Sequence, residues 1–179
     1  MRVLFLAGWL LAGAASGSAQ TAAAREYQVK AVFLFNFAQF VDWPPAAFAT
    51  SNAPLVIGVL GDDPFGPILD EAVRDEKAGG HPLAIQRYRR LEDVSGCHVL
   101  FISRSEATRL ESVVAALRDR GVLTVSDTGN AARRGVMIHF LNENNRVRLR
   151  INLDAIKRAG LTASSKLLRA GEVVGDNPP

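Results

Sequence analysis

Four strand-like apolar runs and the helical stretches between them set the pattern of the middle of the chain. The runs are Leu55–Leu60, the half-exposed segment His81–Leu91, Cys97–Ser103 and Val122–Asp127. After the first run, Asp63 is the expected cap of a helix that begins at Pro64. After the third, apolar residues recur at helical spacing from Glu106 to Arg120, with Ser105 as cap and Gly121 as stop. Alternating buried strands and helices predict parallel βαβ units and therefore a layered α/β domain.

The segment Gly135–Ala155 is predicted to form a β-hairpin that turns at Asn144-Asn145, because asparagine tolerates the positive φ of a tight turn. Matching the apolar faces of its two strands places Phe140 opposite Leu149 and Ile138 opposite Ile151, in the core. The same register places three arginines on the other face, each opposite a residue of the first strand: Arg146 opposite Glu143, Arg148 opposite Leu141 and Arg150 opposite His139.

That arginine face is open to two interpretations. It is either solvated or covered by a helix, or it is a surface that binds a partner or ligand. Met137 and Leu141 share the face, and apolar residues with a polar rim are typical of an interface. Two short helices, at 154–160 and 164–171, are expected after the hairpin. The whole prediction is a single α/β domain, a mostly parallel sheet with helices on both faces and a C-terminal β-hairpin plus short helices.

The segment Arg25–Trp43 is predicted to form one helix that stops at the prolines following it. Its apolar side carries a row of aromatic residues that are expected in the core: Phe33, Phe37 and Phe40. Lys30 lies on this side as well, and it either snorkels to solvent or pairs with a buried carboxylate. Phe35 and Trp43 interrupt the narrow polar stripe. The helix is therefore either deeply buried or covered by a partner chain.

The N-terminus has the order of a secretory signal peptide. A basic residue, Arg2, precedes the apolar run Val3–Ala15, and small residues ending at Ala19 follow it. The run is short for a membrane span, which needs about 20 residues. We therefore expect cleavage after residue 19, export to the periplasm and no direct membrane insertion. Residues 25–170 would form the domain, and residues 171–179 a loose tail.

Composition argues against a nucleic-acid partner and against an internal disulfide. The formal net charge of the chain is +3, and losing Arg2 with the signal peptide lowers it to +2, so no nucleic-acid partner is expected. The chain has one cysteine, Cys97, which is expected to be a small buried hydrophobe because a single thiol cannot form an internal disulfide.

No catalytic constellation is evident. The three histidines lack metal-ligand spacing, no nucleophile elbow is present, and the loop after the first strand lacks the P-loop pattern. We therefore expect no metal, no cofactor and no enzymatic activity. Ser126-Asp127 suits turn chemistry better than catalysis, although a hydrolase using this pair is a minor alternative.

Another class of function uses the carboxyl ends of the strands. In α/β sheets, small ligands bind in a crevice at these ends. The crevice would lie between Gly61–Phe65 and Ser126–Asn130. Its candidate ligand-binding residues are Asp62, Asp63, Ser126 and Asp127. This alternative is a periplasmic small-molecule binding module.

Three stretches together resemble the YfiR family of periplasmic proteins: Tyr27–Pro44, Gly135–Leu161 and Ser164–Ala170. The resemblance implies a compact α/β domain that forms a homodimer. It also implies a regulator that binds the periplasmic region of an inner-membrane diguanylate cyclase and holds the enzyme off, which lowers cyclic di-GMP and so affects biofilm and motility. Some relatives carry paired cysteines, but this chain has only Cys97, so no disulfide is carried over.

A regulator of this kind needs a binding surface rather than catalytic residues. We expect Phe35 and Trp43 to be the apolar anchors of that surface. The polar partner-binding residues would come from the hairpin: His139, Arg146, Arg148 and Arg150.

Overall fold

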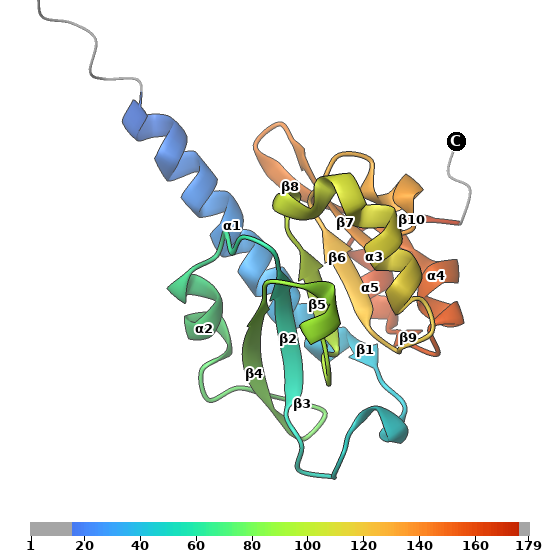
Figure 1. The fold of residues 1–179 in the computed structure, drawn as a ribbon. Helices are drawn as coiled ribbons and strands as arrows, with labels where there is room; N and C mark the ends of the chain where they lie inside the picture. The colour runs from blue at the N-terminus through green and yellow to red at the C-terminus, as the bar shows by residue number, and fades with distance from the viewer. Residues whose placement is uncertain (1–15, 176–179) are drawn as a thin grey trace, which may run out of the picture.

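This computed structural model describes residues 16–175 of the chain, and the strands within that range form an eight-stranded sheet (Figure 1). Its strands are β2 (Leu55–Leu60), β3 (Lys77–Ala78), β4 (His81–Tyr88), β5 (Val99–Ile102), β6 (Leu123–Ser126), β7 (Ile138–Glu143), β8 (Arg146–Asn152) and β10 (Glu172–Val174). They lie in the order β10-β8-β7-β6-β5-β2-β4-β3, and only the pairs β7–β8 and β3–β4 are antiparallel. A separate pair joins β1 (Val41–Asp42) to β9 (Thr162–Ala163).

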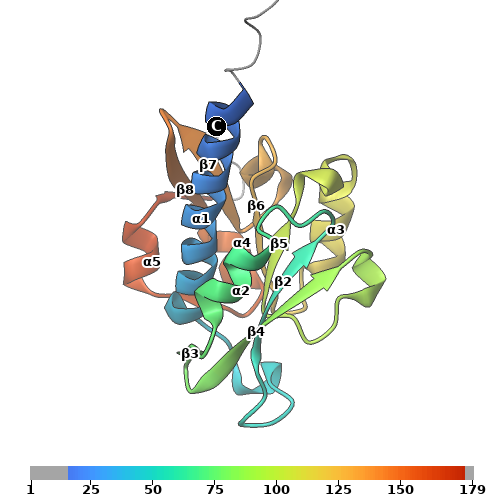
Figure 2. The same cartoon turned by 90° about the vertical axis from the view of Figure 1, so that its left-hand side faces the viewer.

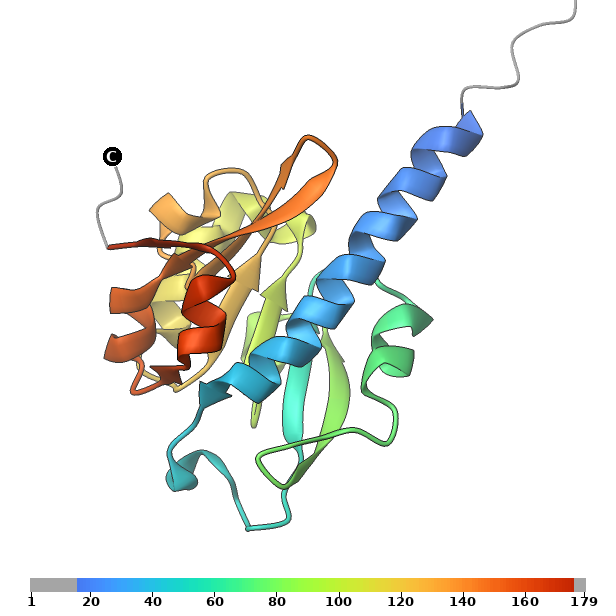
Figure 3. The same cartoon turned by 180° about the vertical axis from the view of Figure 1, so that it is seen from behind.

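Helices cover both faces of the sheet, as Figures 2 and 3 show from the side and from behind. One core cluster joins the sheet to α1 (Ser16–Phe40), α2 (Pro67–Val73), α4 (Leu153–Arg158) and α5 (Ser165–Arg169). A second cluster joins it to α3 (Leu110–Leu117). Short 3-10 turns complete the chain at Pro45–Ala47, Leu91–Asp93, Arg104–Arg109 and Ala131–Arg134. The predicted layered α/β class is confirmed.

The predicted hairpin register is confirmed. Phe140 pairs with Leu149 and Ile138 with Ile151, while the three arginines lie opposite Glu143, Leu141 and His139. Asn144 and Asn145 both have a positive φ, 52° and 59°, as the tight turn requires. Of the predicted core residues, Phe37, Phe140, Leu149 and Cys97 are buried, and Phe33 and Phe40 are half-buried against the same core.

Two helices differ from the prediction in their bounds. The first helix begins at Ser16 instead of Arg25, and it ends at Phe40 instead of Trp43, because Val41–Asp42 pairs with β9 and Pro44 favours extended backbone before it. The helix after β2 begins at Pro67 instead of Pro64. Asp63 does not cap it: its Oδ1 accepts from the Phe65 N–H and its Oδ2 binds Arg87, which closes a turn ahead of the helix.

The remaining differences concern α3 and the C-terminus. The stretch predicted as one helix from Glu106 to Arg120 is a 3-10 turn, Arg104–Arg109, followed by α3. Its cap is Ser103, whose hydroxyl accepts from the Ser105 N–H, instead of Ser105. Glu172–Val174, expected in the loose tail, pairs in parallel with β8, because that edge of the sheet leaves backbone groups to be satisfied.

Helix α1 projects beyond the sheet at its N-terminal end, beside the tip of the β7–β8 hairpin (Figures 1 and 3). Residues 1–15 of the predicted signal peptide lie outside the described residues. Within residues 16–175, no helix combines the length and the apolar character needed to cross a bilayer.

Gly58 in β2 occupies a place where no side chain fits. A Cβ there would lie 2.7 Å from Tyr88 Cε2, 2.8 Å from Cys97 Sγ and 2.9 Å from Leu100 Cδ1. We expect Gly58→Ala to lower the free energy of unfolding by about 1–3 kcal/mol, because these buried neighbours must move. Urea denaturation measures it, with Gly129→Ala as control, since a Cβ at Gly129 meets nothing within 4 Å. Equal effects of the two substitutions would contradict the packing argument.

Candidate functional site

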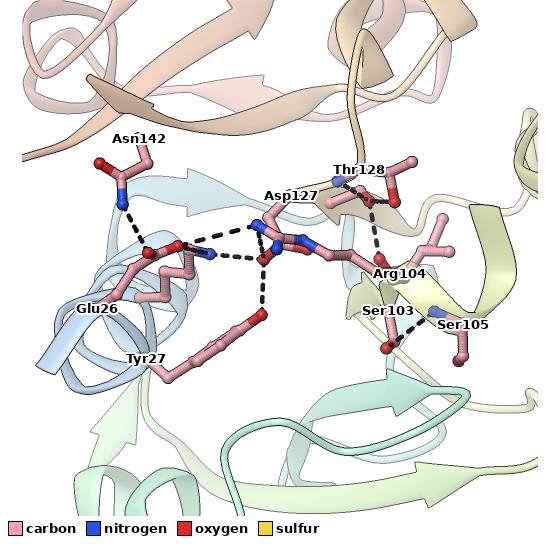
Figure 4. A network of polar contacts seen from close by, with 11 residues as sticks. Glu26, Tyr27, Ser103, Arg104, Ser105, Asp127, Thr128 and Asn142 are labelled. Atoms are coloured by element: carbon pink, nitrogen blue, oxygen red, sulfur yellow. Dashed lines mark hydrogen bonds and ion pairs between the residues drawn. The ribbon is translucent and has the colours of Figure 1, made fainter. Parts of the chain in front are cut away.

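A cluster of charged side chains joins α1 to the carboxyl ends of β5 and β6 (Figure 4). Asp127 follows β6 directly, and Arg104 lies just beyond β5. These strands are neighbours and parallel, so both residues reach the same edge of the sheet. Lys30 comes from α1, and its Nζ lies 2.6 Å from Asp127 Oδ2 and 2.5 Å from Glu26 Oε1. The side chain of Lys30 is 1% exposed, so of the two predicted roles it takes the pairing with a buried carboxylate.

Further bonds close the cluster. The Tyr27 hydroxyl donates to Asp127 Oδ2 over 2.9 Å, and the Arg104 guanidinium lies 3.2 Å from the same oxygen. Asn142 Nδ2 donates to Glu26 Oε2 over 2.6 Å, which connects the hairpin to α1. Two cations therefore face two carboxylates, and the formal charges balance. Such pairing is what makes burial of ionised groups tolerable.

The cluster shifts two pKa values. Burial raises the pKa of Glu26, but hydrogen bonds from Lys30 and Asn142 outweigh burial, so the pKa lies below its ordinary value. Burial raises the pKa of Tyr27, and the negative charge of Asp127 raises it further. Glu26 is thus held ionised and Tyr27 protonated, the states in which their hydrogen bonds form.

His139 is buried beside this cluster, opposite Arg150 and next to Ser126 in the sheet. Burial lowers its pKa, and the charge of Arg150 lowers it further. Burial likewise lowers the pKa of His98. Among the described protein groups, His139 Nδ1 and Asp127 Oδ1 have no hydrogen-bond partner. Protonating His139 therefore adds charge to a buried region without a ready acceptor at Nδ1.

Because the pKa values of His98 and His139 are lowered, we expect the folded protein to lose stability in mild acid. Both folded-state pKa values lie below the unfolded value of about 6.5, so the unfolded chain binds more protons below that pH. The free energy of unfolding should be highest above pH ~6.5 and fall as the pH drops through ~6.5 towards the folded-state values. Denaturation between about pH 7 and pH 5 measures how steeply the free energy of unfolding changes with pH. His139→Gln and His98→Gln should each make this change less steep. An unchanged slope in both variants would contradict this.

The predicted ligand-binding residues lie at the carboxyl ends of two strands that are not direct neighbours, and their ligand-binding role stays a prediction. Asp62 and Asp63 follow β2 while Ser126 and Asp127 lie at the end of β6, and β5 lies between those strands. The Ser126 hydroxyl donates to the Ile102 carbonyl and accepts from the Thr128 N–H, which is turn chemistry. Within residues 16–175, no group of three or more His, Cys, Asp or Glu side chains is placed to hold a metal ion.

The predicted partner-binding residues are spread over the molecule. Arg146 and Arg148 are exposed on the hairpin, whereas Arg150 is half-buried and lies 2.9 Å from Glu172. Phe35 is half-buried against the core. Trp43, also half-buried, donates its indole N–H to the Gly121 carbonyl over 3.0 Å and packs edge-on against His98.

The positions of these residues bear on their predicted roles without deciding them. Trp43 follows β1, at the other end of α1 from the hairpin tip (Figure 3). His139 is only 3% exposed, so very little of its side chain is accessible to a partner in this conformation. Trp43 and the hairpin tip lie at opposite ends of α1, and the partner-binding roles of all six residues stay predictions.

Four residues of the cluster were not among the predicted site residues: Glu26, Tyr27, Arg104 and Asn142. Two of them left a signal in the sequence. Glu26 precedes Lys30 by four residues, the favourable orientation for a pair on a helix. Arg104 and Asp127 follow adjacent apolar runs, so their side chains meet if the runs form neighbouring parallel strands. Nothing local marks Tyr27 or Asn142.

The fold and the cluster define an α/β protein with a curled, mostly parallel sheet, to which buried ion pairs hold the N-terminal helix. A family model for YfiR/HmsC-like proteins matches residues 27–172, and the chain belongs to this family. The family is one of periplasmic regulators of cyclic di-GMP signalling, not a known family of enzymes. A search among curated proteins found no match.

Proposed function

We propose that the protein is a periplasmic regulator that inhibits an inner-membrane diguanylate cyclase through the cyclase's periplasmic region, so lowering cyclic di-GMP. The observation that carries this proposal is the family match over residues 27–172, which includes α1 from Tyr27 onward, the hairpin and the C-terminal helices. Inhibition by binding requires only that the protein prefer the inactive state of the cyclase. A preference of about 2.7 kcal/mol changes the ratio of the two states about a hundredfold.

The proposal extends to location and assembly. The signal peptide, residues 1–19, directs export and is cleaved, and the mature chain acts as a homodimer without cofactor or catalytic residues. Arg146 and Arg148 support a binding role, because both are exposed and neither forms an ion pair within the described chain. Exposed charges at an interface rim orient partners and speed their association.

Direct binding tests the proposal. The purified mature protein is titrated into the isolated periplasmic regions of the inner-membrane diguanylate cyclases of the same cell, with calorimetric detection. One of them should bind with a Kd of about 1 µM or tighter, or about −8 kcal/mol, which an interface of ordinary size supplies. The periplasmic region of a sensor without a cyclase domain is the control. Binding to the control alone would contradict the proposal.

A further inference from the structure

A groove of about 770 Å³ lies between the N-terminal turns of α1 and the tip of the β7–β8 hairpin. Both of these elements project from the same end of the sheet (Figures 1 and 3). Apolar side chains line the groove from both sides: Ala22, Ala23 and Val29 from α1, and Val147 from β8. Arg25 and Arg146 line it as well, one from each side. The groove therefore combines apolar walls with two cationic groups.

The positive charge of the groove is not neutralised within the described chain. Neither Arg25 nor Arg146 forms an ion pair with another described residue, although Glu143 lies opposite Arg146 in the hairpin. Glu26 also lines the groove, but Lys30 and Asn142 occupy its two oxygens. An occupant with carboxylates would thus find two guanidinium groups available for charge-assisted hydrogen bonds.

Apolar surface continues from the groove along the outside of α1. Val29 is 45% exposed and Val32, one turn further on, is 54% exposed. Exposed large apolar side chains that adjoin a cationic groove are typical of a protein-binding surface. A small molecule held in the groove would leave Val32 uncovered, whereas a segment of a protein would cover the groove and Val32 together.

We propose that this groove docks an acidic segment with apolar side chains from the protein's signalling partner. The identity of that partner, a diguanylate cyclase, rests on the proposed function, while the chemistry of the segment rests on the groove. A second copy of this chain would present α1 with Arg25 on its exposed side, and the described part of α1 has one carboxylate, Glu26, which is already paired. Charge complementarity therefore favours a different protein over self-association through α1.

A photo-crosslinker at position 32 tests the proposal in living cells. Val32→p-benzoylphenylalanine is introduced into the full chain, and the adduct is isolated and sequenced at the site of attachment. Val173, which is 45% exposed on β10, is the matched control position. The crosslinker chain is then combined with Arg25→Glu and Arg146→Glu, or with the control Arg89→Glu on an exposed residue after β4.

The expected adduct joins position 32 to an acidic segment of another protein. Arg25→Glu with Arg146→Glu should lower its yield about tenfold, while Arg89→Glu changes it by less than about twofold. Melting temperatures establish that each variant is folded, and Arg25→Gln with Arg146→Gln replaces the double reversal if it is not. A yield insensitive to both double substitutions, an adduct with a second copy of this chain, or no adduct at position 32 overturns the proposal.

The same adduct separates this inference from the proposed function. One outcome is an adduct that joins position 32 to an acidic segment of a protein other than a cyclase and whose yield depends on charge. That result would support binding of an acidic segment in the groove and would overturn the cyclase assignment. A cyclase captured equally well after charge reversal would uphold the proposed function and overturn the acidic groove.

Discussion

Lys30→Met is expected to lower the free energy of unfolding by about 3–5 kcal/mol, because it removes the central cation of a buried cluster. The Lys30 ammonium lies within 2.6 Å of carboxylate oxygens of Asp127 and Glu26, and its side chain is 1% exposed. Without it, two carboxylates share one remaining cation, Arg104, whose side chain is 61% exposed. Uncompensated buried charge is among the costliest defects that a substitution can create.

Denaturation of the mature chain in urea at neutral pH measures this effect. Lys157→Met is the matched control: Lys157 is exposed on α4, and its loss should change stability by less than about 0.5 kcal/mol. Adding Asp127→Leu to Lys30→Met should recover part of the loss, since an apolar pair can replace a buried ion pair. A loss below about 1 kcal/mol for Lys30→Met alone would show that the cluster does not hold α1 to the sheet.

Phe37→Ala is expected to cost a similar amount, about 3–5 kcal/mol, for an apolar reason. Phe37 is 1% exposed, and its ring centroid lies 6.1 Å from that of Phe33 and 5.8 Å from that of Phe140. Removing the ring leaves a cavity between α1 and the hairpin that neighbouring rings fill only in part. Val32→Ala on the same helix is the control, because Val32 is 54% exposed and should lose less than about 1 kcal/mol. Equal losses of unfolding free energy in Phe37→Ala and Val32→Ala would mean that α1 does not pack against the sheet through Phe37.

Both substitutions also bear on function. Helix α1 supplies one wall of the groove proposed to bind the partner, and Lys30 and Phe37 hold that wall in place. A chain whose α1 is loosened should therefore bind less partner and be degraded faster in the cell. Immunoblots of the periplasmic fraction separate these two effects by showing how much protein remains.

The hairpin shows how much of this fold a sequence can predict. Side chains alternate in a strand with a period of two, so only one register buried Phe140 and Leu149 together. The asparagines at the turn accept positive φ with little cost, and they fixed the loop length. The parallel strands of the sheet were predicted from apolar runs that alternate with helical stretches. Alternation, turn residues and apolar runs each involve residues close together in the chain, so they can be recognised in the sequence itself.

The charged cluster could be predicted only in part, because its members meet only after the chain has folded. Lys30 and Asp127 are 97 positions apart, and the order of the strands decides that Arg104 and Asp127 end side by side. The sequence therefore left two roles open for Lys30, snorkelling to solvent or pairing with a buried carboxylate, and it did not identify that carboxylate. The start of α2 was misplaced for a similar reason: Arg87, on a strand not adjacent in sequence, binds Asp63 and Asp70 and favours a turn before Pro67.

If the protein restrains a diguanylate cyclase from the periplasm, as we propose, its loss should change the level of intracellular cyclic di-GMP. We would measure cyclic di-GMP in a strain lacking the gene, complemented with the native chain, with Arg25→Glu/Arg146→Glu, or with the control Arg89→Glu. We expect cyclic di-GMP to rise on deletion, and we expect the native and control chains, but not the charge-reversed chain, to reverse that rise. An unchanged level of cyclic di-GMP on deletion, under growth conditions in which the protein is made, would contradict it.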